Sequence, residues 1–140
     1  MSSAQSTVFA DTAYWIAIVD RHQSLHRRAT EVSRSLGLTP IVTSDVVLTE
    51  LLNFFCERGE YWRSISTRLV DELLANPQVT VEPQTRDLFL AGLSLYRSRR
   101  DKGYSMTDCT SMVMMQRRGV RAVLTSDHHF EQEGLDILLG

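Results

Sequence analysis

Four carboxylates in this sequence have the type and positions that suit a divalent-cation site: Asp11, Glu50, Asp108 and Asp127. If they converge they repel one another, because two unit charges about 4 Å apart cost roughly 4 kcal/mol at an effective dielectric constant of about 20. A divalent cation removes that cost, and a set of oxygen ligands favours Mg²⁺ or Mn²⁺ over zinc. Such an ion positions a water, lowers its pKa and neutralises phosphoryl oxygens during in-line attack.

Three of these carboxylates also have an ordinary structural explanation as helix caps. Asp11 precedes a helix predicted to begin at residue 12, and Asp127 precedes the turn HHFEQ. Asp108 lies three residues after Ser105, which is the spacing of a capping box. Each explanation is adequate for one residue taken alone, and the joint pattern is what favours a metal site.

Glu50 is harder to explain as a structural residue. It lies in the middle of a predicted helix, and its neighbours at helical spacing are Val46, Val47 and Phe54. We therefore expect its carboxylate on an apolar face, where an isolated buried charge costs several kcal/mol. Asn53 is the only polar neighbour on that side, so Glu50 needs a partner from outside its own helix.

The elements that must position these carboxylates alternate between strand and helix along the chain. Strands are predicted at 7–11, 40–44, 79–83, 121–127 and 135–139, and helices at 12–19, 22–35, 45–58, 60–76, 85–102 and 106–118. This alternation predicts an α/β fold with a parallel sheet covered by helices on both faces. The strands are short and almost entirely apolar, as expected of strands that are buried on both sides.

Two of the four carboxylates fall at strand ends. Asp11 closes the first predicted strand, and Asp127 closes the fourth. Ligands of open α/β sheets bind outside the carboxyl ends of the strands, so both residues are expected at the functional edge of the sheet.

Composition fits one compact cytoplasmic domain over residues 1–140. The sequence has no apolar run long enough for a membrane span, and its N-terminus lacks the basic head and long apolar middle of a secretory signal. Cys56 and Cys109 match no zinc spacing, and we expect two reduced, mostly buried thiols.

Three segments carrying the four carboxylates resemble the PIN-domain family of metal-dependent ribonucleases, and within it the VapC-type toxins of toxin–antitoxin pairs. FADTAYWIAIVDRHQSLHRRA, from residue 9, resembles the opening of the family, and IVTSDVVLTELLN, from residue 41, resembles its second block. YSMTDCTSMVMMQRRGVRAVLTSDHHFEQEGLDIL, from residue 104, resembles the final third. Each block is a weak signal alone, but all of them in order cover nearly the whole chain.

The resemblance implies a three-layer α/β/α sandwich around a mostly parallel five-stranded sheet of order 3-2-1-4-5. It implies that Asp11 and Asp108 are the main ligands of Mg²⁺ or Mn²⁺. Glu50 and Asp127 would act through water or hold a second ion, and Thr125 would offer a supporting hydroxyl.

The resemblance further implies an activity and partners. The expected activity is endonucleolytic cleavage of RNA, including structured RNA such as tRNA or rRNA, by the toxin of a toxin–antitoxin pair. The expected partners are a cognate antitoxin, whose tail covers the cleft, and a second copy of the chain in a homodimer, with no membrane. Tyr14 and Trp15 either line that cleft or belong to the core.

Other functions remain open at this point. The chain could be a housekeeping RNA-processing nuclease, or a binding module for RNA or protein without turnover. A phosphate-receiver domain is disfavoured because the only lysine, Lys102, is not placed after the last strand. A haloacid-dehalogenase phosphatase would need Asp-x-Asp where this chain has Asp11-Thr-Ala. The pair His128–His129 after Asp127 is interpreted as a solvated turn, with a metal ligand as the alternative.

Two basic runs flank the predicted helix that carries Asp108. Fourteen of the fifteen basic residues are arginine, which binds phosphate with a bidentate fork but is also common in GC-rich genomes. Either run could hold RNA phosphates or form a solvated helix end. The first run contains Arg97, Arg99, Arg100 and Lys102, and the second contains Arg117, Arg118 and Arg121.

Overall fold

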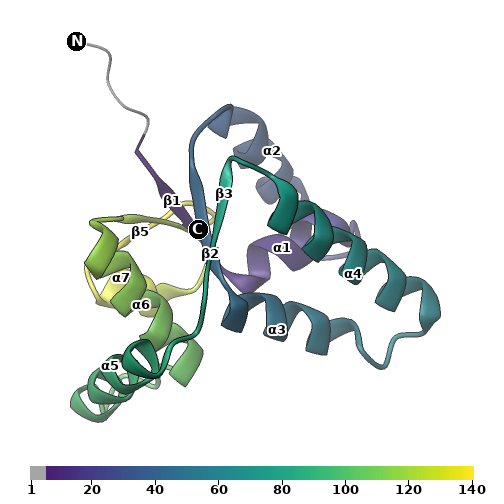
Figure 1. The fold of residues 1–140 in the computed structure, drawn as a ribbon. Helices are drawn as coiled ribbons and strands as arrows, with labels where there is room; N and C mark the ends of the chain where they lie inside the picture. The colour runs from purple at the N-terminus through teal and green to yellow at the C-terminus, as the bar shows by residue number, and fades with distance from the viewer. Residues whose placement is uncertain (1–5) are drawn as a thin grey trace.

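A computed structural model of the protein describes residues 6–140 and shows the predicted alternation of strands and helices (Figure 1). The order of elements is β1 (Val8–Ala10), α1 (Thr12–Val19), α2 (His26–Leu36), β2 (Ile41–Ser44), α3 (Asp45–Phe55), α4 (Glu60–Ala75), β3 (Val79–Glu82), α5 (Arg86–Ser98), α6 (Met106–Arg118), β4 (Ala122–Leu124), α7 (His128–Gln132) and β5 (Asp136–Ile137).

The five strands form one sheet of order β3-β2-β1-β4-β5, and every pairing is parallel. Phe9 in β1 is paired with Val42 on one side and with Val123 on the other, so β1 is the central strand. All three residues of β1 are buried. The predicted strand order is confirmed, and the direction of strand progression reverses between β1 and β4, where open α/β sheets bind their ligands.

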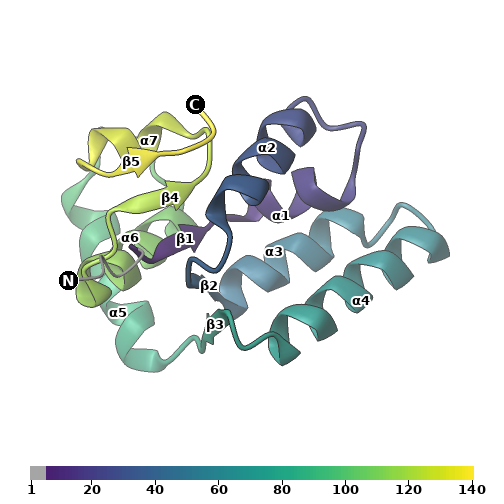
Figure 2. The ribbon, with the colours of Figure 1, turned by 90° about the horizontal axis from the view of Figure 1, so that it is seen from above.

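Helices cover both faces of the sheet and make three layers. Figures 1 and 2 show α1 to α4 on one side of the strands and α5 to α7 on the other. Right-handed crossovers require this division, because the chain moves one way along the sheet from β1 to β3 and the other way from β3 to β5. Each layer supplies one completely buried phenylalanine, Phe55 from α3, Phe9 from β1 and Phe130 from α7.

The second helix begins later than the sequence predicts, at His26 rather than residue 22. The preceding turn is held by the completely buried carboxylate of Asp20, which accepts hydrogen bonds from the backbone N–H of His22 and the side chain of Gln23. These hydrogen bonds lower the pKa of Asp20. Arg58 approaches the same carboxylate at 3.4 Å, so this turn is tied to the end of α3.

Helices α5 and α6 approach one another closely at Gly92. A Cβ added to Gly92 would lie 2.9 Å from Thr110 Oγ1 and 3.3 Å from Thr110 Cα. We predict that Gly92→Val destabilises the protein by about 1–3 kcal/mol, because overpacking forces the two helices apart. Denaturant unfolding of Gly92→Val and of Ser94→Val, an exposed position on the same helix, measures this. Equal stability of the two variants would contradict the prediction.

Other expectations from the sequence concern single residues. Cys109 is buried as predicted, but Cys56 is exposed because it follows the last turn of α3 and does not face the sheet, and both thiols are free. Among residues 6–140, no helix combines the length and apolarity that crossing a membrane requires. The expectation that the N-terminus is not a secretory signal falls partly on residues 1–5, which lie outside the described part of the chain.

Candidate metal centre

Asp11 and Thr125 join the ends of the two neighbouring strands β1 and β4. Asp11 directly follows β1 and is only 9% exposed, and its Oδ2 accepts a hydrogen bond of 3.0 Å from the completely buried hydroxyl of Thr125. The same hydroxyl oxygen accepts a hydrogen bond of 3.2 Å from the backbone N–H of Asp127. Asp11 occupies the N-cap position of α1, but its carboxylate makes no capping hydrogen bond of standard geometry. The hydrogen bond from Thr125 therefore ties the side chain to the sheet edge.

The negative charge of Asp11 is not fully compensated by its surroundings. Its pKa is raised to about 6, mainly by burial, with further increases from the negative charges of Asp108 and Glu50. A pKa raised by burial and by like charges is characteristic of functional carboxylates. The charges of Asp108 and Glu50 therefore reach Asp11, although the three acids come from three different elements.

Asp108 is both a helix cap and a member of the site. Its backbone N–H donates to Ser105 Oγ over 3.0 Å, and its Oδ2 accepts from the Ser105 N–H over 3.1 Å, so the predicted capping box is present. The same Oδ2 lies 3.2 Å from Nδ1 of His129. Burial raises the pKa of Asp108, and the charge of Asp127 raises it further. Capping alone does not account for a buried carboxylate placed beside a second one.

Asp127 and His129 complete a cluster with Asp108. One ligand atom from each of the three residues lies within 4.8 Å of the others. His129 Nδ1 is 3.4 Å from Asp127 Oδ1, and the His129 backbone N–H donates to that same oxygen over 2.9 Å. Asp127 therefore caps α7 as well, which was the alternative explanation from the sequence.

His129 is the site residue that the sequence interpretation placed wrongly. Of the histidine pair, His128 is exposed and contacts Glu131, whereas His129 is half-buried. His129 is turned inward toward Asp108. One feature of the sequence could have indicated this position. His129 lies two residues after Asp127 at the start of a helical turn, and this spacing places its backbone N–H and its ring near the capping carboxylate.

Glu50 differs from its expectation in one respect and agrees in another. It is exposed and not buried, because α3 packs against the sheet through Val47, Leu51 and other residues on a different side of the helix. It does find a partner outside its own helix, since the Thr12 hydroxyl at the start of α1 donates to its Oε1 over 2.7 Å. Glu50 therefore lies at the outer, solvated margin of the carboxylate group.

Tyr14 and Trp15 belong to the core, which decides between the two interpretations of this pair. They are 3% and 4% exposed. The Tyr14 hydroxyl is hydrogen-bonded to Ser33, and the Trp15 indole N–H donates to Thr43.

The donor set fits a hard divalent cation. Asp11, Asp108 and Asp127 contribute carboxylate oxygens, Glu50 adds another at the margin, and His129 adds one ring nitrogen. Burial and like charges raise the pKa values of Asp11 and Asp108, and a bound cation would offset both effects. Oxygen-rich sites of this kind favour Mg²⁺ or Mn²⁺.

Thr125 gives a prediction about how Asp11 is held. Thr125→Val removes the hydroxyl that donates to Asp11 and accepts from Asp127, while it keeps the shape of the side chain. Loss of such a supporting hydrogen bond reduces metal affinity by about 10- to 100-fold, and we expect a decrease of that size. Titration of the purified variant with Mn²⁺, followed by calorimetry, measures it. Thr110→Val is the control and should bind like the wild type, because it removes a buried hydroxyl that donates to the Met106 carbonyl within α6. Equal affinity of the wild type and Thr125→Val would contradict the prediction.

Residues 8–133 match the sequence profile of the PIN domain. No curated protein sequence is similar enough to be counted as a relative.

Solved structures share the fold over almost the whole chain. The crystal structure of VapC20 from Mycobacterium tuberculosis, described as a sarcin–ricin loop cleaving toxin, has a TM-score of 0.79 at 25% identity and covers 91% of this chain and 95% of its own. FitAcB from Neisseria gonorrhoeae has a TM-score of 0.67 at 14% identity over 94% of this chain and 96% of its own. FitAB bound to an IR36 DNA fragment has a TM-score of 0.70 at 14% identity over 93% and 92%. The last two similarities concern the fold alone.

Proposed function

The chain belongs to the PIN-domain family, and from that premise we propose that it is a metal-dependent endoribonuclease, the toxin of a toxin–antitoxin pair. The observation that carries the proposal is the convergence of Asp11, Asp108 and Asp127 at one sheet edge, with raised pKa values at the first two. These acids come from positions far apart in the sequence. Helix capping explains their backbone positions but not their convergence.

In this proposal Asp11 and Asp108 are the principal ligands of Mg²⁺ or Mn²⁺, and Asp127 and Glu50 act through water or hold a second ion. A bound divalent cation supplies a water of lowered pKa and neutralises charge on the phosphate. The Thr125 hydroxyl fixes the orientation of the Asp11 carboxylate. When His129 Nδ1 carries a proton, it donates a hydrogen bond to Asp108. When it carries none, its lone pair would be available to the ion.

The proposed substrate and partners rest on the similarity to VapC20. That toxin is described as cleaving the sarcin–ricin loop, and its similarity at 25% identity supports RNA as the substrate class here. A cognate antitoxin that covers the carboxylates, a homodimer and a cytoplasmic location complete the proposal.

Cleavage of total RNA by the purified protein tests the function. Discrete fragments should appear with Mg²⁺ or Mn²⁺ and disappear with EDTA, because the carboxylates are inactive without an ion to hold. Fragments that persist in EDTA would rule out metal dependence. A folded protein that binds RNA but yields no fragments with either ion would replace the nuclease by the binding module.

A further inference from the structure

A basic and aromatic pocket lies directly beside the carboxylate cluster, at the end of α5. Its volume is about 570 Å³, within the range of roughly 300–1,000 Å³ typical of ligand sites. Its lining consists of Tyr96, Arg97, Arg99, Arg100, Gly103 and Tyr104. We call it the α5 pocket. Among the described residues 6–140, none that lines this pocket is acidic.

The α5 pocket adjoins the cluster through Tyr104 and Gly103. The Tyr104 ring lies 5.3 Å from the His129 ring, centroid to centroid. A Cβ on Gly103 would lie only 3.8 Å from His129 Nε2, and Gly103 has a φ of +72° that favours glycine. No side chain therefore projects from Gly103 between the pocket and His129, which itself contacts Asp108 and Asp127.

The inner wall of the α5 pocket is fixed by Glu133. Its carboxylate accepts from Arg99 Nε over 2.7 Å and from the Tyr104 hydroxyl over 3.1 Å. These contacts lower the pKa of Glu133, while burial and Glu133 raise the pKa of Tyr104 to about 12. Arg99 is thus a partly exposed structural cation whose charge is already compensated by Glu133.

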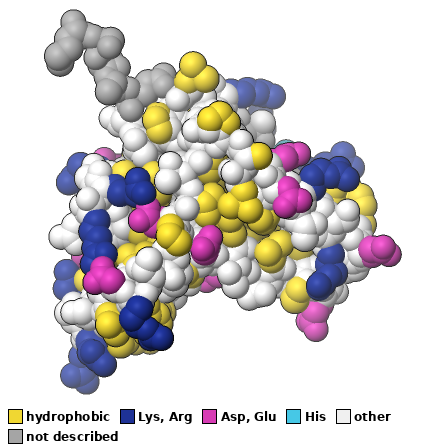
Figure 3. All heavy atoms as spheres, in the orientation of Figure 1, with side chains coloured by type: hydrophobic (Ala, Val, Ile, Leu, Met, Phe, Trp, Pro, Cys, Tyr) yellow, Lys and Arg dark blue, Asp and Glu magenta, His cyan; other side chains and the backbone are white. Residues whose placement is uncertain are grey.

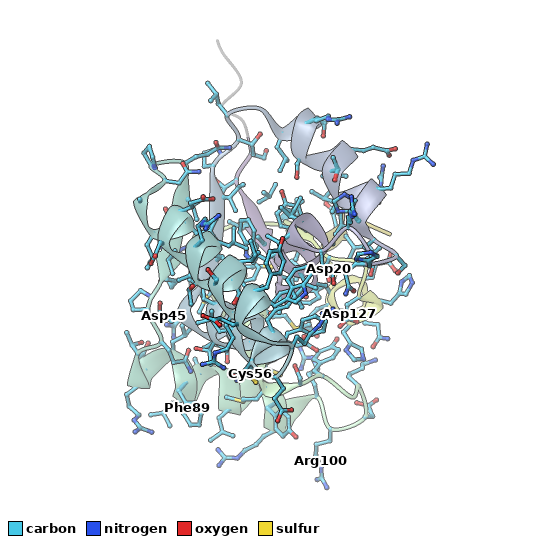
Figure 4. The ribbon with its side chains drawn as sticks, turned by 90° about the vertical axis from the view of Figure 1, so that its right-hand side faces the viewer. Asp20, Asp45, Cys56, Phe89, Arg100 and Asp127 are labelled. Carbon is cyan, nitrogen blue, oxygen red and sulfur yellow. The ribbon has the colours of Figure 1, made fainter. Side chains whose placement is uncertain are left out.

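Two other cations of the α5 pocket have no such partner. Within residues 6–140, neither Arg97 nor Arg100 makes an ion pair or a side-chain hydrogen bond. Arg100 extends from the end of α5 away from the body of the protein (Figure 4). Tyr96, on the same helix end, leaves 48% of its surface exposed. The pocket therefore offers two uncompensated guanidinium groups and an open aromatic face.

The second basic run lacks this character, which separates two surfaces that the sequence could not distinguish. Arg117 pairs with Asp87 at 2.8 Å, Arg118 pairs with Glu82, and Arg121 donates to the Gly134 carbonyl. Several Lys and Arg side chains lie over the α5–α6 layer on the left of Figure 3, with acidic side chains among them. Ion pairing leaves the α5 pocket as the better phosphate-binding surface.

We infer that the α5 pocket binds one nucleotide of the RNA next to the scissile phosphate, with its base stacked on Tyr96 and its phosphate held by Arg97 and Arg100. Every base has a face that stacks on an aromatic ring, and guanidinium groups bind phosphate through bidentate hydrogen bonds. This inference rests on the proposed function for the class of ligand. The proposed binding mode requires that the RNA chain run from the α5 pocket past Gly103 and His129 to the carboxylates.

Binding without turnover tests the α5 pocket separately from cleavage. The probe is a fluorescein-labelled single-stranded RNA of mixed sequence, about eight nucleotides long, titrated with the full-length protein in EDTA and followed by fluorescence anisotropy. Tyr96→Ala should weaken binding roughly 5- to 150-fold, and Tyr96→Phe should bind like the wild type because it keeps the ring. Arg100→Ala should reduce the slope of log affinity against log salt by about 0.7, the value for one phosphate contact on a single strand.

Matched controls come from α4, in the opposite helical layer. Tyr61→Ala removes a tyrosine that is 68% exposed, and Arg68→Ala removes an exposed arginine without an ion pair among residues 6–140. Both controls should bind the probe like the wild type. If the α4 and α5 variants weaken binding equally, or if none weakens it, the α5 pocket is not the site.

The outcomes distinguish this inference from the proposed function. Unchanged binding in Tyr96→Ala and Arg100→Ala, together with metal-dependent cleavage, overturns the inference and leaves the nuclease intact. Pocket-dependent binding without any cleavage supports the α5 pocket and overturns the nuclease.

Discussion

Asp108→Asn is expected to reduce metal-dependent RNA cleavage by roughly 100- to 10,000-fold, because a metal ligand and its charge contribute several kcal/mol to catalysis. The fold should persist, since an asparagine side chain keeps the size of aspartate and an oxygen that can accept the hydrogen bond from Ser105 N–H. The measurement is the rate of fragment formation from total RNA with Mn²⁺, beside the unfolding midpoint of each protein.

Ser105→Ala is the matched control, because it removes the other half of the same capping box. It deletes the hydroxyl that accepts from the Asp108 N–H and leaves the Asp108 carboxylate in place. We expect a loss of about 1 kcal/mol in stability with cleavage largely retained. If Asp108 were only a cap, the two variants would lose stability and activity together. That result would remove Asp108 from the site.

The second large effect concerns the stability of the metal-free protein and its dependence on pH. The pKa of Asp11 is raised from 3.8 when unfolded to about 6 when folded, so the folded state binds the proton more tightly. The contribution of this group to stability is complete below about pH 4 and is lost as the pH rises through about 6. The full difference is about 3 kcal/mol. Asp11→Asn has no such proton and should lack this dependence.

This contribution of Asp11 to the free energy of unfolding is isolated by denaturant unfolding in EDTA. The wild type and Asp11→Asn are compared at about pH 5 and about pH 8. The stability of the variant relative to the wild type should increase by about 1 kcal/mol or more at the higher pH. Titrating groups that do not interact with Asp11 cancel in this comparison because both proteins contain them. A difference that is constant with pH would mean that the Asp11 carboxylate ionises as easily when folded as when unfolded.

Much of this fold follows from local sequence patterns. Short apolar strands ending at Asp11 and Asp127 alternate with helices, and a parallel sheet with covered faces is the arrangement that buries such strands on both sides. Ser105 and Asp108 specified the start of α6 correctly, because a capping box depends only on residues close together in the chain. Strand order came from the family resemblance.

What the sequence did not show depends on contacts between distant elements. Glu50 was expected to be buried because its helical neighbours are apolar, yet Phe54 itself is 43% exposed, so that side of α3 does not face the core. His129 was assigned to a solvated turn. Its contact with Asp108 joins α7 to α6, and a contact between two distant elements is not visible in the sequence. The difference between the two basic runs depends on Asp87 and Glu82, whose proximity to Arg117 and Arg118 only the packed structure reveals.

The central position of β1 determines the lifetime of the site. Asp11 follows a three-residue strand that is completely buried and hydrogen-bonded to a neighbour on each side. Segments of this kind are among the last to open, so we expect their amide hydrogens to exchange with a free energy of opening close to that of global unfolding. The Asp11 carboxylate therefore cannot be displaced by a local fluctuation of a loop. On heating, we therefore expect activity to be lost at the same rate as the protein unfolds, with no faster loss of activity.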